Sequence, residues 1–303
     1  MDNIKRTSDL NSKILYLSKG VFVSELSYFS SLYPDIAKKY FNEVAIETIA
    51  QGMVLFIPNN TKIDRFINLK EIVENFSDTE KRLFVIVGSF ACVKIYNFIE
   101  NLEKFIHSID FFVEEGASVS FIGCYLDFDE SKIITHDLNI FLIEKNCKVD
   151  CKIFCIVDGV QNIVFRTKQQ HLSGDSHSNL ILNCIAFENS HFEYEGKIFI
   201  DKNCSKVEAY QNNKNIILEN NVVVNSMPIL EILSNDVLCK HSTATGQIDK
   251  DSLFYLQTRG LSEKEANILL LENVFDFLIN SFDNKKIKDT VLRRVKEKIR
   301  KIL

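Results

Sequence analysis

The sequence predicts a mainly β core flanked by small helical segments, and it favours a parallel β-helix for that core. From Met53 to about Thr245, short apolar stretches are broken by Asn, Asp, Gly and Ser, as in strands joined by turns. Late in this zone the stretches recur roughly every seven to ten residues, which hairpin meanders and a parallel β-helix can both produce. Asparagine is frequent at the breaks and tolerates the left-handed conformation of sharp corners, which favours the β-helix.

The N-terminal segment, about residues 1 to 50, is predicted to be helical. The apolar spacing of Ile36, Ala37, Tyr40, Phe41 and Val44 fits a helix. A proline precedes this group at position 34, where a helix can begin.

The core, residues 51 to 245, contains stretches that read as strands and asparagines that read as corners. The predicted strands include residues 119–122, 139–143, 162–165, 180–182, 197–200, 215–218, 222–224 and 229–233. The predicted corners include Asn203, Asn212, Asn213, Asn220, Asn221 and Asn225.

Residues 246–303 are predicted to form a C-terminal helical domain. Asp249 is a candidate N-cap for a helix over 250–258 that Gly260 ends. Ser262 and Glu265 form a capping box that opens a second helix. A third helix follows, with an apolar stripe from Ile287 to Ile302 and basic residues along its outer face.

The composition argues against several classes of protein. Acidic residues outnumber basic ones, 41 to 36, so a nucleic-acid surface has little support. No apolar run approaches the roughly 18 residues of a membrane span, and the N-terminus lacks the apolar core of a secretory signal. We therefore expect a cytoplasmic protein with eight reduced cysteines. Walker A is absent, so any ATP would have to be bound by another protein.

Cys239 and His241 are the candidate metal ligands. Residues two apart on a strand share a face, and thiolate and imidazole both bind iron or zinc. Two ligands cannot complete a four-coordinate site, so the others would come from another chain or from the sulfide of a cluster. The alternative interpretation is a buried thiol beside a hydrogen-bonded imidazole.

Two other groups of polar residues are predicted to be structural. Cys151 and Cys155 alternate with polar residues, which indicates a strand face packed in the core. The segment from His171 to Ser178 contains His, Ser and Asp but lacks a nucleophile-elbow glycine pattern, so we interpret it as a corner.

Several runs resemble one family. Residues 195–198, 209–218 and 226–232, which lead into Cys239-Lys240-His241, resemble the SufB/SufD family of iron-sulfur cluster assembly proteins and are more similar to SufD than to SufB. The likeness is strong from about residue 190 to 280 and fainter before it, where residues 50–58 and 171–178 resemble further family segments.

The resemblance implies a right-handed parallel β-helix and a non-enzymatic scaffold subunit. It implies pairing with a SufB-like subunit through the β-helix ends and docking of the ATPase SufC on the C-terminal helices. Cys239 and His241 match SufD positions at the cluster-forming interface, where a transient iron or iron-sulfur cluster would be held; no cofactor is expected to bind stably to the chain alone. The positions matching the SufC-docking region are Leu253, Phe254, Tyr255, Arg259, Gly260, Leu269, Leu270 and Phe275.

Departures from the family pattern keep alternatives open. Val222 stands where SufB has its sulfur-accepting cysteine, and Ser242 and Thr243 replace residues of a His-Gly-Ala-Thr run. One alternative is a purely structural SufD-like partner with a degenerate metal site, and another is a β-helix carbohydrate-active enzyme. Because β-helix ends present open edges, a homodimer is possible when the SufB-like partner is absent.

Overall fold

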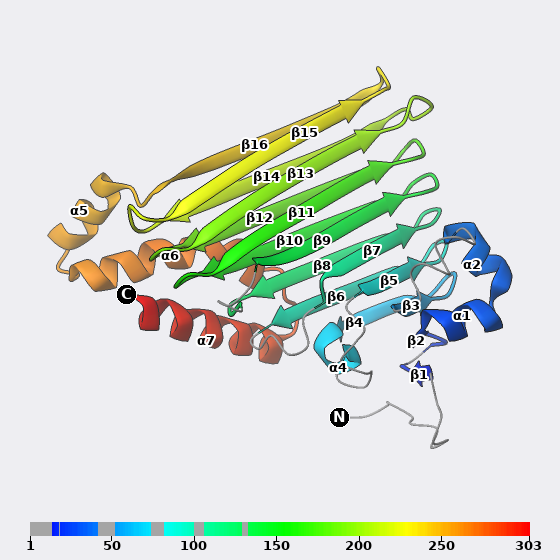
Figure 1. Cartoon of the computed structure of the whole chain (residues 1–303), viewed down its shortest axis with the longest axis horizontal. Helices are drawn as coiled ribbons and strands as arrows, with labels where there is room; N and C mark the ends of the chain where they lie inside the picture. Colours follow the sequence, from blue (N-terminus) through cyan, green and yellow to red (C-terminus); the bar gives the residue numbers. More distant parts are fainter. Residues whose placement is uncertain (1–13, 18, 42–51, 74–81, 100–105, 129–132) are drawn as a thin grey trace.

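The core of the protein is a β-solenoid of about six turns, built from two sheets whose strands alternate along the chain (Figure 1). The computed structural model describes residues 14–17, 19–41, 52–73, 82–99, 106–128 and 133–303. From β3 onward each strand pairs in parallel with the strand two places later, which confirms the predicted β-helix and is incompatible with hairpin meanders.

One sheet, called sheet A, holds the odd-numbered strands and an antiparallel β2. Its strands in spatial order are β1 (Ile14–Tyr16), β2 (Phe22–Glu25), β3 (Met53–Ile57), β5 (Arg82–Val87), β7 (Ser108–Val113), β9 (Ile133–Leu142), β11 (Asn162–His171), β13 (His191–Ile200) and β15 (Val223–Ile232).

The other, sheet B, is parallel throughout. Its strands in spatial order are β4 (Lys62–Asn68), β6 (Cys92–Ile99), β8 (Ser118–Tyr125), β10 (Lys148–Val157), β12 (His177–Ala186), β14 (Val207–Ile217) and β16 (Val237–Gln247).

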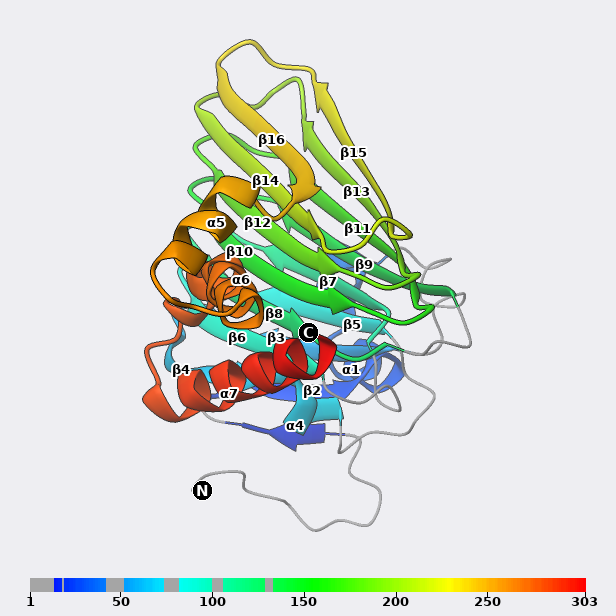
Figure 2. The same cartoon turned by 90° about the vertical axis from the view of Figure 1, so that its left-hand side faces the viewer.

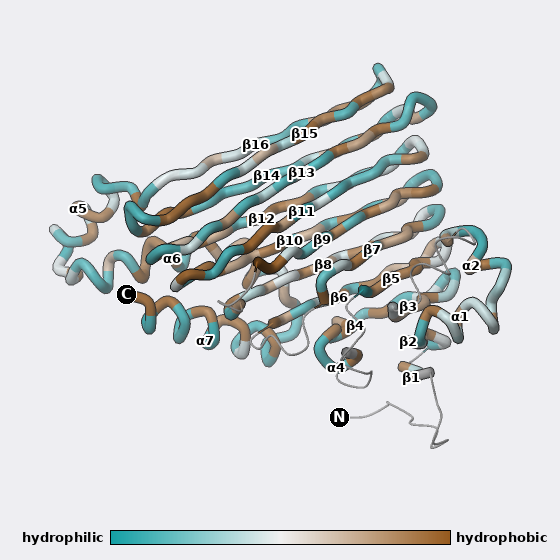
Figure 3. Tube along the Cα trace, in the orientation of Figure 1, coloured by the Kyte–Doolittle hydropathy of each residue, from teal (hydrophilic) through white to brown (hydrophobic). Residues whose placement is uncertain are grey.

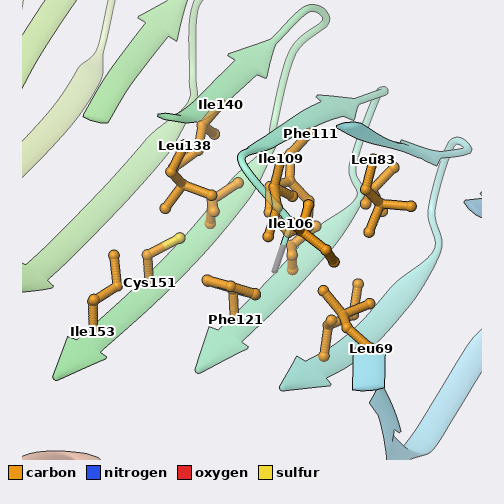
Figure 4. Close-up of a cluster of buried hydrophobic side chains, with 14 of the residues drawn as sticks. Leu69, Leu83, Ile106, Ile109, Phe111, Phe121, Leu138, Ile140, Cys151 and Ile153 are labelled. Carbon is orange, nitrogen blue, oxygen red and sulfur yellow. The ribbon is translucent and has the colours of Figure 1, made fainter. Parts of the chain in front are cut away.

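The interior between the sheets is a continuous apolar core. Alternate residues of each strand point inward, so brown and teal alternate along many of the strands in Figure 3. Leu83, Phe111 and Phe121 belong to this core (Figure 4), where the rings of Phe111 and Phe121 lie 5.4 Å apart. Cys151 and Cys155 are buried here too, so their predicted packing role is confirmed.

Asparagine turns the chain at some corners and not at others. Asn60 and Asn146 have positive φ angles in turns, and Gly116 takes the equivalent conformation where a Cβ would meet the Phe90 ring at 2.5 Å. Asn203, Asn220 and Asn221 also lie in turns. The prediction is wrong for Asn212, Asn213 and Asn225, which lie inside strands β14 and β15.

Some predicted strands proved to be parts of longer ones. Residues 223–224 and 229–232 belong to the single strand β15, which continues through the polar residues between them. Pro228 is tolerated there because β15 is an edge strand, where a missing N–H can face away from the ladder.

Small elements cover the first turns of sheet A. Helices α1 (Leu26–Leu32) and α2 (Pro34–Tyr40) pack through Phe29 and Ala37 on the aromatic outer face of sheet A. The helix predicted at Pro34 is confirmed, whereas β1 and β2 were not predicted; Val44 lies outside the described residues. A further short helix, α4 (Leu69–Val73), follows β4.

Three C-terminal helices follow β16, and two of them cover the outer face of sheet B (Figure 2). They are α5 (Lys250–Thr258), α6 (Glu263–Ile279) and α7 (Lys285–Ile302). The predicted N-cap at Asp249 and the capping box of Ser262 and Glu265 are both present. Phe275 of α6 packs on Phe154 of β10, and Asn183 of β12 donates a hydrogen bond of 2.8 Å to a carbonyl of α6.

Candidate functional site

The two strands at the C-terminal end of the solenoid have free edges. In the described chain, β15 pairs with β13 alone and β16 pairs with β14 alone. The opposite end is protected differently: antiparallel β2 covers the edge of β3, and β4 carries an irregular register with exposed charges at Lys62, Asp64 and Arg65. Bulges and charges discourage strand addition, so the C-terminal end is the one suited to pairing.

Apolar side chains are exposed along this open end. They lie on both faces of β15, in the turn after it and at the start of β16, and their exposed fractions are between 37% and 54%. The set comprises Val223, Met227, Leu230, Ile232, Leu233 and Leu238. A concentration of such residues on a free edge is typical of a protein–protein interface.

Cys239 and His241 both lie on β16, on the face directed at the solenoid interior. Cys239 is in register with Ala209 and His241 with Gln211, and both of these β14 residues are buried inside the solenoid. Cys239 packs against the small apolar cluster that contains Ala209, whereas His241 is exposed because no further strand covers it. The two side chains therefore share one face at the open end, as the strand periodicity predicts.

The thiol of Cys239 is protonated at neutral pH. Desolvation by burial raises its pKa above the ordinary value for cysteine. A thiol must lose its proton to bind a metal, so an incoming cation would have to displace it.

The pair is chemically incomplete within this chain. In the parts of the chain that the structure describes, no group of three or more His, Cys, Asp or Glu side chains is arranged to hold a metal ion. Val222, at the position where the family's sulfur-accepting cysteine was expected, is half-buried and packs against the core. The arrangement can therefore supply at most part of a ligand set.

A groove lies between α5 and α6. Its volume is about 400 Å³, and its walls combine acidic groups from the start of α5 with apolar side chains from both helices. The lining residues are Asp249, Asp251, Ser252, Tyr255, Leu256, Leu269, Leu270 and Asn273.

Of the predicted docking residues, Tyr255, Leu269 and Leu270 line this groove, and the others lie outside it. Phe254, Tyr255 and Leu269 are exposed, and Leu253 and Leu270 are half-buried. Arg259 donates a hydrogen bond of 3.1 Å to the hydroxyl of Tyr255, and Gly260 ends the helix region with a φ of +95°. Phe275, by contrast, is fully buried under α6, so it supports the helix from inside and does not reach the surface.

The strand bearing Cys239 and His241 runs almost directly into the groove. Only Ile248 and Asp249 separate the end of β16 from α5. None of the residues of α5 is buried, and the helix projects beyond the ends of the sheets (Figure 1). Displacement of α5 would consequently act on the edge strand that carries both candidate ligands.

The segment from His171 to Ser178 forms a closed corner. The ring nitrogens of His171 lie 2.7 Å from the Ser176 hydroxyl and 2.8 Å from that of Ser178, all three residues being buried. Burial lowers the pKa of His171 to about 3, so the ring is neutral. The His171 ring is buried with both nitrogens engaged, and the chain turns here between β11 and β12, in agreement with its interpretation as a corner.

Sequence reasoning missed a polar network inside the open end. Asn213, Asn215, Ser226 and Thr245 are joined by hydrogen bonds across β14, β15 and β16. The alternation of residues along β14 could have revealed it. Gln211, Asn213 and Asn215 are polar, whereas the residues in register with them on β12 are Leu180, Leu182 and Cys184.

Across the described residues, none of the helices combines the length and apolar character that crossing a membrane requires.

Comparison with known proteins identifies the family. The model of the SUF system FeS cluster assembly, SufBD core domain, matches residues 54–274, which include most of the solenoid together with α5 and most of α6. The chain is 27% identical over 153 residues to the iron-sulfur cluster assembly SufBD family protein slr0076 of Synechocystis, a match covering 47% of this chain and 31% of the relative.

Two further relatives agree. Iron-sulfur cluster assembly protein SufD of Escherichia coli is 25% identical over 134 residues, covering 44% of this chain and 32% of the relative. Protein ABCI7, chloroplastic, of Arabidopsis thaliana is 28% identical over 134 residues, covering 40% and 28%. The aligned region thus spans about a third of the length of each relative. The family model matches more than half of the length of this chain, and the chain therefore belongs to the SufBD family of iron-sulfur cluster assembly proteins.

Proposed function

We propose that this chain is a non-catalytic, SufD-like scaffold subunit for iron-sulfur cluster assembly. It pairs with a SufB-like subunit through β15 and β16 and holds iron or a nascent cluster transiently with Cys239 and His241. The observation that supports this most directly is an incomplete pair of ligands on the edge strand β16, at the end of the solenoid where β15 exposes apolar side chains.

Pairing at the open end accounts for both the edge and the ligands. A partner strand beside β15 or β16 would satisfy the free backbone groups and cover the apolar side chains there. The same partner would bring the remaining ligands to the exposed His241 side chain, and the iron and sulfide would be the cargo of the assembled complex. Val222 in place of cysteine leaves sulfur acceptance to the partner.

The groove between α5 and α6 is the proposed docking site for a SufC-like ATPase. Tyr255 offers exposed aromatic surface in the groove, and Asp249 and Asp251 supply acidic groups there. Phe254 adds a second exposed ring on α5. Aromatic anchors surrounded by charged groups are common at protein interfaces. Because α5 continues directly from β16, nucleotide-driven movement of the ATPase would reach the strand of His241.

Co-expression with SufB-like and SufC-like proteins tests the proposal. A complex that co-purifies with all three subunits is expected, and its absence would count decisively against the scaffold role. Phe254→Ala with Tyr255→Ala should reduce SufC recovery while leaving the SufB-like subunit bound. Val160→Ala, at an exposed apolar side chain in a corner between β10 and β11, is the matched control.

A purely structural partner is the second candidate. Among the described residues no third His, Cys, Asp or Glu side chain joins Cys239 and His241, and burial raises the pKa of the Cys239 thiol, which disfavours the metal-binding thiolate. His241→Ala separates the two candidates, because the exposed side chain can be removed without disturbing the fold. If the complex still forms but assembles far fewer clusters, the ligand role holds. If cluster formation is unchanged, the structural role holds.

A further inference from the structure

The interior of the solenoid changes character at its open end. The inward-facing column formed by Tyr125, Cys155 and Cys184 continues with Asn215 and Thr245 in the last two turns. The neighbouring column changes from Ile153 and Leu182 to Asn213 and Thr243. Amides thus replace core side chains where the solenoid ends.

These amides form a closed hydrogen-bond network. Asn213 and Asn215 exchange reciprocal hydrogen bonds of 3.0 and 2.8 Å between their side-chain amides. The side-chain amide nitrogen of Asn213 also donates a hydrogen bond of 3.1 Å to the backbone carbonyl oxygen of Leu182. Both asparagines are buried, and neither has an orphaned polar atom. A fully satisfied buried network resists rearrangement, because each broken bond leaves a polar group unpaired.

The network reaches both terminal strands. Asn215 of β14 donates a hydrogen bond of 3.0 Å to the hydroxyl of Thr245 on β16. Ser226 of β15 donates one of 2.7 Å to the side-chain oxygen of Asn213. One pair of buried asparagines therefore ties the edge strand of sheet B to the edge strand of sheet A across the interior.

Terminal strands depend on such side-chain hydrogen bonds for their register more than internal strands do. An internal strand is held in register by neighbours on both sides, whereas β15 and β16 each have one neighbour in the described chain. A slip of β16 by one residue would turn Cys239 and His241 outward and direct Lys240 and Ser242 to the interior, because the side-chain period of a strand is two. Buried polar groups can specify a single register.

We propose that Asn213, Asn215, Ser226 and Thr245 are positioning residues: they lock the register of β15 and β16 and so keep Cys239 and His241 on the interior face. The significance of that face for metal binding rests on the proposed function. The register lock itself is a property of the chain alone, and its test requires no partner.

Amide hydrogen exchange on the full chain, read by mass spectrometry, tests the lock. Thr245→Val removes the hydroxyl acceptor with almost no change in shape, and Thr245→Ser keeps the hydroxyl. We expect amides of β16 to exchange about two- to ten-fold faster in Thr245→Val, corresponding to the loss of one part-buried hydrogen bond. In Thr245→Ser the exchange should stay near the wild-type rate, and amides of β10 should be unchanged in both variants.

A second pair of variants tests the β15 side and the position of the thiol. Ser226→Ala should accelerate exchange in β15, and Ser226→Thr should preserve it. In Thr245→Val the alkylation of Cys239 by a maleimide should accelerate by a factor similar to that of β16 exchange. Cys92, which is half-buried on the distant strand β6, is the internal reference for that reaction.

Three results would overturn the proposal: unchanged exchange of β16 in Thr245→Val, equal acceleration in Thr245→Val and Thr245→Ser, or acceleration spread evenly over all strands. The last result would indicate global destabilisation. If the exchange follows the expectation but no complex with SufB-like and SufC-like proteins forms, the register lock stands and only the proposed function fails.

Discussion

Replacing Lys298 with methionine is expected to lower the free energy of unfolding by about 2 kcal/mol, because it removes an ion pair that joins α7 to the solenoid. The ammonium of Lys298 lies 2.8 Å from Asp127, just after β8, and 2.6 Å from Asp158, just after β10. Methionine keeps the apolar stem of the side chain, so the change isolates the charge.

The magnitude follows from how far the groups are buried. The side chains of Lys298 and Asp158 are 12% and 18% exposed, while that of Asp127 is 47% exposed. Exposed pairs contribute about 0 to 1 kcal/mol, and breaking a fully buried pair costs about 3 to 5 kcal/mol. A value near 2 kcal/mol lies between these limits. One buried oxygen of Asp158 has no hydrogen-bond partner in the folded protein, so removing Lys298 would leave this carboxylate still less well paired.

The pH dependence has a defined sign. Burial by itself lowers the pKa of Lys298, but its hydrogen bonds and charge interactions with Asp127 and Asp158 outweigh this and raise it. A raised pKa means that the stabilisation is fully present below the unfolded value of about 10.4 and is lost as the pH rises through the folded value. The difference between wild type and Lys298→Met should therefore be the same at pH 7 and pH 9.

Urea unfolding followed by circular dichroism measures the effect as a shift of the midpoint at constant slope. Arg293→Met is the matched control on the same helix, since Arg293 pairs with Glu297 at 3.4 Å with both side chains at least half exposed. That control should change the free energy of unfolding by less than about 0.5 kcal/mol. A loss as small as this in Lys298→Met would refute the reasoning, as would a difference that disappears between pH 7 and pH 9.

Two further perturbations are expected to act at the open end of the solenoid and at the contact between α2 and the corner after β7. Met227→Lys, at a half-exposed side chain on β15, should weaken pairing at least about ten-fold in pull-downs with a SufB-like partner. It should leave the free energy of unfolding within about 0.5 kcal/mol of the wild-type value. Undiminished pairing would contradict the assignment of the interface. Glu114→Gln should cost about 1 kcal/mol near neutral pH, because Glu114 accepts hydrogen bonds from Lys39, Tyr40 and Ser89. Burial alone raises the pKa of Glu114, but the hydrogen bonds from these residues lower it overall. The stabilisation is therefore present above about pH 4.3 and is lost as the pH falls through the lower pKa of the folded state. Thermal unfolding between pH 7 and pH 3 should show a weaker pH dependence of stability in the variant.

The local chemistry of the helix ends could be predicted closely. The capping box of Ser262 and Glu265 and the N-cap at Asp249 depend on residues within one turn, so nearest neighbours in the sequence determine them. Strands were less predictable at their ends. Asn225 suggested a corner, whereas β15 runs straight through it because its ladder with β13 holds the backbone extended.

The candidate site divides in the same way. The strand period placed Cys239 and His241 on one face from the sequence alone. The pairing of β16 with β14, which sets Cys239 beside Ala209 and His241 beside Gln211, decides that this face is the interior one. The paired residues are 30 positions apart in the chain, so the spacing of residues within β16 does not predict the pairing. The burial of Phe275 likewise depends on Phe154, more than a hundred residues away.

The sequence by itself determined the class of fold, the order of the β core and the C-terminal helices, the pairing of thiol and imidazole on one strand, and the resemblance to the SufB/SufD family. These depend on periodicity, capping and short motifs, which are local. Only the tertiary structure decided that the strand of His241 is a free edge, that Asn213 and Asn215 lie inside the solenoid, and that α6 and α7 cover sheet B. The physical reason is that a solenoid brings residues of successive turns into contact, so burial at any position is set by the residues about 30 positions before and after it.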